Sequence, residues 1–203
     1  IFINSIMASL FDTLQAQAFR AGIQGRTKES QKWFKKKVQE LTVPSRQKIL
    51  RDTALKRTGT EIRGNMYMYF YDPKLKNELP YYDRFPLSII VDPAPGGFYG
   101  INLHYLNYNV RASFLDDLMA LGPAQPRENS RLRKIRYNLL KGTRKYKEFK
   151  PCFKHYLGKH VKSQFALVPM TEWEIAIFLP IEQFKKKSKT AVWQESLKIA
   201  RRP

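Results

Sequence analysis

The chain has 203 residues, of which 43% are hydrophobic, and a formal net charge of +20 from 37 Lys/Arg and 17 Asp/Glu. This much apolar material supports a sizeable core and excludes disorder throughout. Cys152 is the single cysteine, which excludes an internal disulfide and favours a reducing compartment. No stretch approaches the roughly 20 apolar residues of a membrane span, so no membrane partner is expected. Residues 1–10 lack the basic start of a signal peptide, and we expect Met7 to be the natural first residue.

The charge is distributed in blocks. Residues 26–63 hold 12 Lys/Arg against 4 Asp/Glu, residues 127–162 hold 13 against 2, and residues 181–203 hold 7 against 2. Residues 64–126 hold 4 Lys/Arg against 6 Asp/Glu, and they contain 12 of the 24 Phe and Tyr residues of the chain. These blocks predict an aromatic folded centre with separate positive surfaces, for which nucleic acid is the first candidate partner. A basic surface that serves solubility or an acidic protein partner is the alternative.

Three short helices are predicted to open the chain. Ser9 is the expected N-cap of the first, which ends at Gly22. Thr27 is the expected N-cap of the second helix. Ser45 is the expected N-cap of the third, which runs to about Leu55.

Three strands are predicted next, over residues 65–71, 85–92 and 98–106, with a turn over 93–97. The aromatic Met-Tyr-Met-Tyr-Phe-Tyr run of 66–71 favours an extended backbone. For its tyrosines, a place in the sheet core and in cross-strand pairs is favoured over base stacking.

The second half of the chain mixes both periodicities. A helix is predicted over 112–121, and 131–140 fits either element, with strand favoured. A helix interrupted by Pro151 is predicted over 145–157, and a short strand over 163–168.

The C-terminal part is predicted to be helical. Thr171 and Glu174 have the spacing of a capping box before a helix over 175–179. Pro180 then separates this helix from a basic one over 182–201.

These elements predict an α+β fold, with a small antiparallel sheet or partly closed barrel of about five strands and helices at both ends. We expect a single domain overall. Its parts are N-terminal basic helices (1–63), an α+β core with the aromatic strands (64–180) and a basic C-terminal helix (181–203).

Candidate catalytic groups do not form a convincing constellation. The candidates for a metal nuclease are Asp83, Asp92, His104, Asp116 and Asp117. A two-metal site needs several carboxylates that converge around ions about 4 Å apart, and turn or helix-surface roles explain Asp92, Asp116 and Asp117 better. We therefore expect no enzyme, no cofactor and no small-molecule substrate.

A zinc site is considered at Cys152, His155 and His160. Structural zinc requires four ligands in paired spacings, and the chain supplies no second cysteine. Packing of Cys152 in an apolar environment is favoured, and no metal site is expected.

Clustered cations give the stronger signal. Arg side chains form paired hydrogen bonds with phosphate oxygens and Lys side chains act as point charges, so binding should weaken steeply with salt. The predicted nucleic-acid contacts are Arg131, Arg133, Lys134, Arg136, Lys141, Arg144, Lys145 and Lys147, with help from Lys35, Lys36, Lys37, Lys185, Lys186 and Lys187. No helix-turn-helix, zinc-finger or basic-zipper pattern is present, so a binder of the DNA backbone or of a DNA end is expected.

Several stretches resemble a family of tailed-phage virion proteins, the T-even-type DNA end protectors. The resemblance runs over most of residues 7–200, and the stretches that carry it are 7–14, 19–23, 33–34, 66–74, 79–87 and 96–106. The Leu-Pro-Tyr-Tyr-Asp phrase at 79–83 and the Gly-Ile-Asn-Leu-His-Tyr-Leu phrase at 100–106 are its most specific parts.

The resemblance implies a virion protein at the portal or neck, bound to the terminus of packaged double-stranded DNA. Such proteins enter the host with the DNA and shield its end from the host exonuclease. The implied protein partners are portal, neck or tail proteins, and no catalytic residues are implied. The alternative hypotheses are a purely structural neck, baseplate or tail protein with acidic neighbours, and a nuclease of head completion.

Overall fold

The computed structural model of the chain describes residues 10–42, 45–51, 56–59, 61, 63–119 and 147–201. Within them the fold is α+β, as the sequence predicts. The helices are α1 (Leu10–Arg20), α2 (Lys28–Gln39), α3 (Arg46–Arg51), α4 (Tyr108–Met119), α6 (Trp173–Ala176) and α7 (Lys189–Arg201). The strands are β1 (Arg57–Thr58), β2 (Met66–Met68), β3 (Tyr82–Asp83), β4 (Leu87–Ala94), β5 (Gly97–Asn102), β6 (Phe153–Leu157), β7 (Phe165–Val168) and β8 (Phe184–Lys185). The 3-10 turns are η1 (Leu103–Tyr105), η2 (Lys147–Cys152), η3 (Gly158–His160) and η4 (Met170–Glu172).

Six strands form an antiparallel sheet in the order β1-β7-β2-β4-β5-β6, and β3 pairs with β8 in a second, two-stranded sheet. The larger sheet is open, because its outer strands β1 and β6 do not pair with each other. An isolated bridge between Tyr71 and Val161 links the chain after β2 to the chain after η3. The partly closed barrel is therefore not formed, while the antiparallel sheet is confirmed.

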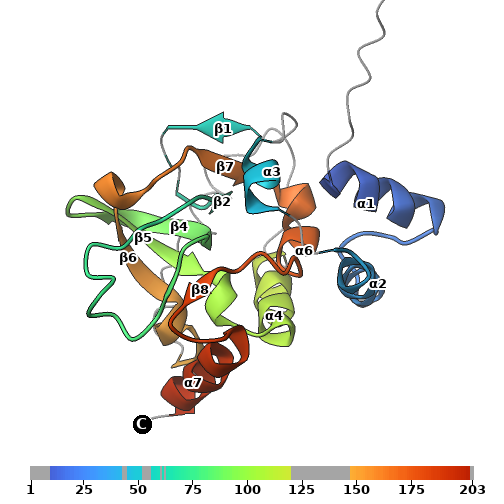
Figure 1. Ribbon diagram of the computed structural model, residues 1–203. Coiled ribbons are helices and arrows are strands. Elements are labelled where there is room, and N and C mark those ends of the chain that lie inside the picture. The colour runs from blue at the N-terminus through green and yellow to red at the C-terminus, as the bar shows by residue number, and fades with distance from the viewer. Residues whose placement is uncertain are drawn as a thin grey trace, which may run out of the picture.

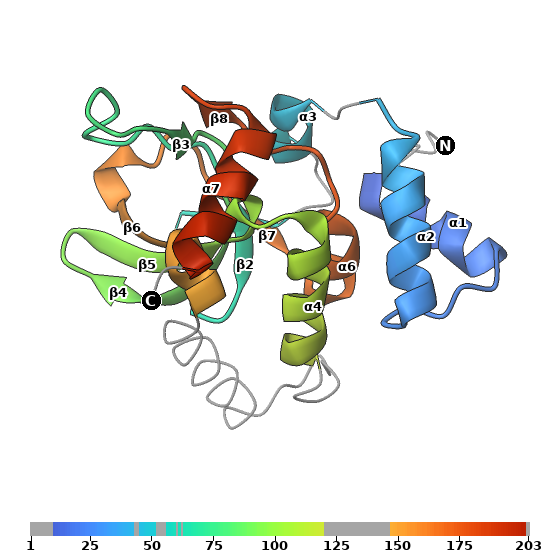
Figure 2. The ribbon, with the colours of Figure 1, turned by 90° about the horizontal axis from the view of Figure 1, so that it is seen from below.

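The helices lie around this sheet (Figure 1). Figure 2 shows α4 between α7 on one side and α2 on the other, with α1 outermost. The starting end of α2 and the final ends of α4 and α7 lie at the same side of the molecule in that view.

The two faces of β2 enter different cores. Met66 and Met68 are fully buried in the main core against the helices, as alternation along a strand requires. Tyr67 and Tyr69 are buried in a second cluster on the opposite face, together with Phe98, Tyr156 and Phe165 among others. This confirms that the central tyrosines are core residues, packed largely edge to face.

A backbone contact at β5 requires glycine. A Cβ atom at Gly97 would lie 1.8 Å from the backbone oxygen of Tyr156 on β6. The missing side chain therefore lets β5 and β6 approach at this point, as glycine in a strand commonly does.

The three predicted strands are confirmed, but their ends differ: β2 ends at Met68 rather than at residue 71, and β4 starts at Leu87 rather than at residue 85. Strand β4 continues through Ala94 into the predicted turn, and β5 ends at Asn102 rather than at residue 106. The Asn102 side chain accepts a hydrogen bond of 3.0 Å from the backbone N–H of His104, which turns the chain into η1.

The predicted helix over 145–157 is wrong. The chain forms η2 up to Cys152, and then β6, which pairs with β5 in the register Phe98 to Tyr156. Pro151 removes a backbone donor, and the free edge of β5 supplies the hydrogen bonds that a helix would otherwise supply.

The C-terminal half differs in two further places. The predicted capping box at Thr171 is absent, since α6 starts after Glu172 without a side-chain cap. The predicted helix over 182–201 is a strand, β8, followed by α7 from Lys189. Lys186 between them has φ of 71°, a left-handed conformation that ends regular structure.

The N-terminal helices agree better with prediction. Helix α1 ends before Gly22, whose φ is 69°, and Thr27 caps α2 in a reciprocal pair with Ser30. Helix α4 starts four residues before its predicted start, because Asn107 accepts hydrogen bonds from the backbone N–H groups of Asn109 and Val110. The proposed cap Ser9, the end of the third helix at 52–55 and the ambiguous segment 131–140 lie outside the described residues.

Candidate nucleic-acid interface

The largest predicted cation cluster falls mainly outside the described residues. The residues of the cluster that lie outside are Arg131, Arg133, Lys134, Arg136, Lys141, Arg144 and Lys145. Lys147 is the first residue of η2. The rings of Phe114 on α4 and Phe149 on η2 lie 4.7 Å apart. The described elements on either side of this basic segment are therefore in contact with each other.

The three lysines of α2 have different environments. Lys35 donates a hydrogen bond of 3.0 Å to the Asn109 side chain of α4. Lys37 lies 2.9 Å from Glu40, and its side-chain hydrogen bond and positive charge lower the pKa of that exposed carboxyl. Lys36 is exposed and has no ion pair among the described residues, so it is the one of the three that is free to meet a phosphate.

The three lysines at 185–187 also have different environments. Lys186 donates hydrogen bonds of 2.9 and 2.7 Å to the backbone oxygens of Asn77 and Leu79. Lys187 forms an ion pair with Glu195 and lies 4.6 Å from the centre of the Tyr81 ring. Lys185 is exposed and takes part in no ion pair in the described part of the chain, so it faces solvent like Lys36.

Further exposed cations were not singled out from the sequence. The described ones outside the predicted set include Lys32, Lys56, Arg57, Lys150, Lys159, Lys162 and Lys198. Each belongs to one of the three basic blocks, so block membership was the available signal. Lys154 is different: its ammonium group lies 3.9 Å from the centre of the Tyr105 ring, and burial lowers its pKa.

The motif residues of the resemblance meet in a buried polar cluster. His104 Nδ1 lies 2.7 Å from Asp83 Oδ2, and Asn102 donates to the same oxygen at 3.2 Å. The backbone N–H groups of Phe85 and Gln183 donate to Asp83 Oδ1. Burial alone would raise the pKa of Asp83, but His104 and these donors hold it below its ordinary value.

This cluster does not form an active site. The side chains of His104 and Asp83 are 0% and 1% exposed, so no substrate reaches them in this conformation. Asp92 pairs with Arg63, and Asp116 accepts from Lys28 and Gln31. No group of three or more potential metal ligands occurs among the described residues, so these give no support to a metal nuclease.

The residues of the considered zinc site also have other roles. Cys152 is fully buried, and burial raises the pKa of its thiol to about 12. His155 hydrogen-bonds the backbone oxygen of Pro95 at 3.1 Å, and His160 that of Asp72 at 2.8 Å. These contacts explain the three residues without a metal.

A second buried cluster joins α4 to the C-terminal part of the chain. Arg111 donates to the backbone oxygens of Leu106 and Ile177, each at 2.8 Å, and it is fully buried. Glu182 lies 3.9 Å from Arg111 and 2.8 Å from Lys189 at the start of α7. Arg111 therefore serves the core and is not exposed to DNA.

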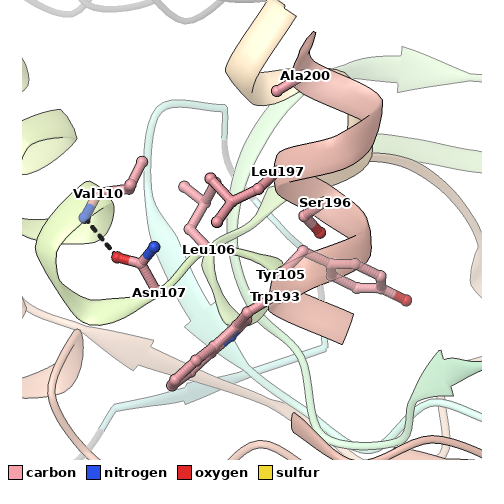
Figure 3. A pocket seen from close by; sticks show the side chains of 8 residues that line it. All are labelled: Tyr105, Leu106, Asn107, Val110, Trp193, Ser196, Leu197 and Ala200. Atoms are coloured by element: carbon pink, nitrogen blue, oxygen red, sulfur yellow. Dashed lines mark hydrogen bonds between the residues drawn. The ribbon is translucent and has the colours of Figure 1, made fainter. Parts of the chain in front are cut away.

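A small apolar pocket lies beside this cluster, between η1, α4 and α7 (Figure 3). Its lining residues are Tyr105, Leu106, Asn107, Val110, Trp193, Ser196, Leu197 and Ala200. Its volume is about 30 Å³, which is the size of one water molecule. No charged side chain lines it, so it is a packing gap under α7 rather than a phosphate site.

Together, the observations define a strongly basic α+β protein in which some exposed lysines, such as Lys36 and Lys185, have no ion pair among the described residues. No described helix is long and apolar enough to cross a bilayer. A model of the family described as phage T4 terminal DNA protecting protein matches residues 2–198, and the chain belongs to that family. The resemblance found in the sequence is thereby confirmed, as is a relation to phage proteins that protect DNA ends. No curated protein and no solved structure matches the chain significantly.

Proposed function

We propose that the protein binds the end of packaged double-stranded DNA at the portal or neck of the phage particle, without catalysis, and shields it from exonuclease. The observation that carries the proposal is the match of residues 2–198 to a family described as protecting terminal DNA. The net charge of +20 supports it, because a duplex end offers a dense array of phosphates. Virion neighbours at the portal, neck or tail would hold the protein in place.

We propose that the contacts come from two sets of cations. The basic segment from Arg131 to Lys147, predicted from the sequence, is the principal set, and Lys36 on α2 and Lys185 on β8, which have no ion pair among the described residues, are additional contacts. Lys35, Lys37, Lys186 and Lys187 have partners within the chain, which a phosphate would have to displace. Their contribution to affinity is therefore expected to be smaller.

The test compares linear duplex with a covalently closed circle of the same sequence. The protein should bind the linear form more tightly, and it should slow digestion of the linear form by a processive double-strand exonuclease. Equal affinity and unchanged digestion would reject end binding and would leave the structural role with acidic neighbours.

A nuclease role is tested separately. Supercoiled plasmid is incubated with the protein and with Mg²⁺ or Mn²⁺. The proposal requires that the supercoiled form persists, whereas nicking that scales with protein concentration would contradict it.

A further inference from the structure

A polar pocket lies where the segments after the two outer strands of the main sheet meet. Gly59 follows β1, and Gly158 follows β6. The pocket has a volume of about 340 Å³ and is lined by Gly59, Glu61, Gly97, Phe98, Gly158, Val161, Ser163 and Phe165.

The lining combines aromatic rings with small residues. Phe98 and Phe165 are among the lining residues and belong to the aromatic cluster on the far side of β2, in which both are buried. Gly59 and Gly158 are exposed at the rim, where a flat group can approach the backbone closely, whereas the space beside Gly97 is filled by the Tyr156 carbonyl. Glu61 adds a half-buried carboxylate, an acceptor for amino groups.

Exposed cations lie close in sequence to lining residues from both segments of this pocket. Arg57 stands two residues before Gly59, and Lys159 and Lys162 lie within the segment that supplies Gly158 and Ser163. All three are exposed. A phosphate backbone could therefore lie across the rim while a base enters the pocket.

The segment 158–163 is held firmly in place. The backbone N–H of Gly158 donates to Gly96 at 2.9 Å, and that of Lys162 donates to Phe70 at 2.8 Å. The Ser163 hydroxyl accepts from the backbone N–H of Phe70 at 2.9 Å. This wall of the pocket is thus formed before any ligand arrives, which reduces the ordering cost of binding.

We propose that this pocket binds one unpaired nucleotide at the terminus of the DNA. The base would contact Phe98 and Phe165 and donate its amino group to Glu61, and the phosphates would lie near Lys159 and Lys162. An added peptide strand fits less well, because β1 has only two residues and offers a short edge. This inference rests on the proposed end binding and adds to it a preference for a particular type of end.

The test uses hairpin duplexes with one open end, which is blunt or carries a single unpaired cytosine or thymine. The cytosine end should bind about fivefold more tightly than the blunt end. This gain in affinity is at the bottom of the range for base–aromatic contacts. The low value is expected because Phe98 and Phe165 are only 1% and 5% exposed. The thymine end should gain less, because thymine has no exocyclic amino group for Glu61.

Gly59→Val provides the decisive variant. A Cβ at Gly59 meets no atom within 4 Å, so the fold should tolerate a larger side chain at this position in the pocket lining. The variant should bind the blunt end like the parent and lose the cytosine preference. Gly25→Val is the matched control, since a Cβ there has its nearest contact at 3.9 Å and lies outside this pocket.

The outcomes separate the two proposals. Equal binding of all three ends by the parent, or a cytosine preference that survives Gly59→Val, overturns the pocket while blunt-end protection still supports end binding. Loss of blunt-end protection itself would reject the proposed function, whatever the ratio between the ends.

Discussion

His104 Nδ1 lies 2.7 Å from Asp83 Oδ2 in the core, and the two residues come from motif segments about 20 positions apart along the chain. Asp83 belongs to β3, which pairs with β8, whereas His104 belongs to η1, which follows β5. The pair therefore fixes the small sheet to the end of the large one. The segments that carried the family resemblance are thus structural in this region.

Asp83→Asn should lower the free energy of unfolding by about 3 kcal/mol, because it leaves the partners of a buried carboxylate poorly matched. The pKa of Asp83 is lowered in the folded state, so its stabilisation is complete above the ordinary value of 3.8 and is lost as the pH falls below it. The variant should therefore lose part of the acid dependence of stability. Denaturant unfolding at neutral and acidic pH checks this, with exposed Asp117→Asn as the unaffected control.

Glu174→Ala should detach the N-terminal helices from the body. The buried carboxylate accepts hydrogen bonds from the Ser30 side chain and, at 3.0 Å, from the backbone N–H of Arg26, at the positive start of α2. Its loss should cost about 2–3 kcal/mol. Hydrogen exchange should quicken in α1 and α2 first. Glu29→Ala, which removes an exposed acid in the first turn of α2, should change the exchange rates little.

Lys185→Ala and Lys187→Ala should behave differently although they are near neighbours. Lys185 is exposed, so its loss should reduce the slope of log affinity against log salt by about 0.9 if it meets one phosphate. Lys187 is engaged by Glu195 and Tyr81, so its loss should leave the slope almost unchanged. Filter binding across a salt series measures both, and the opposite ranking would contradict our assignment.

Replacing Arg131, Arg133, Lys134 and Arg136 together with Ala tests the main basic segment. The salt slope should fall by up to about 3 to 4 units if all four side chains contact phosphates. Stability should be retained, which thermal unfolding checks. An unchanged slope would place the DNA contacts elsewhere on the protein.

Cys152 should be inert in the native protein. Burial raises the pKa of its thiol to about 12, so almost no thiolate exists near pH 8, and no reagent reaches it. A colorimetric thiol reagent should therefore react only after unfolding. Rapid labelling under native conditions would show that the segment from η2 to β6 opens readily.

Much of the fold could be predicted from local patterns. Thr27 with its capping residue and the aromatic alternation of Tyr67 and Tyr69 both had the predicted roles, because capping and alternation act over a few residues. Strand β6 could not be predicted, because its helix-like sequence obtains its hydrogen bonds from β5, about 50 residues earlier. Strand β8 was missed for the same reason, since its partner is β3.

The site was less predictable than the fold. Charge blocks identify Lys35 and Lys36 equally, and only the packing of α2 against α4 turns Lys35 towards Asn109. Likewise Asp83 and His104 look like catalytic residues in the sequence, and only burial shows that they are inaccessible. Composition therefore indicates the class of partner, while the individual contacts depend on tertiary structure.

Gly97 has a consequence for how the sheet assembles. A shift of β5 by one residue against β6 would bring Phe98 to the place where even a methyl group would collide with the Tyr156 carbonyl. This slipped pairing is therefore sterically penalised, in addition to exposing the apolar faces of the strands. The absence of a single side chain thus favours the native strand alignment during folding over one of its two nearest competitors, since the opposite shift would bring Gly96 to the same place.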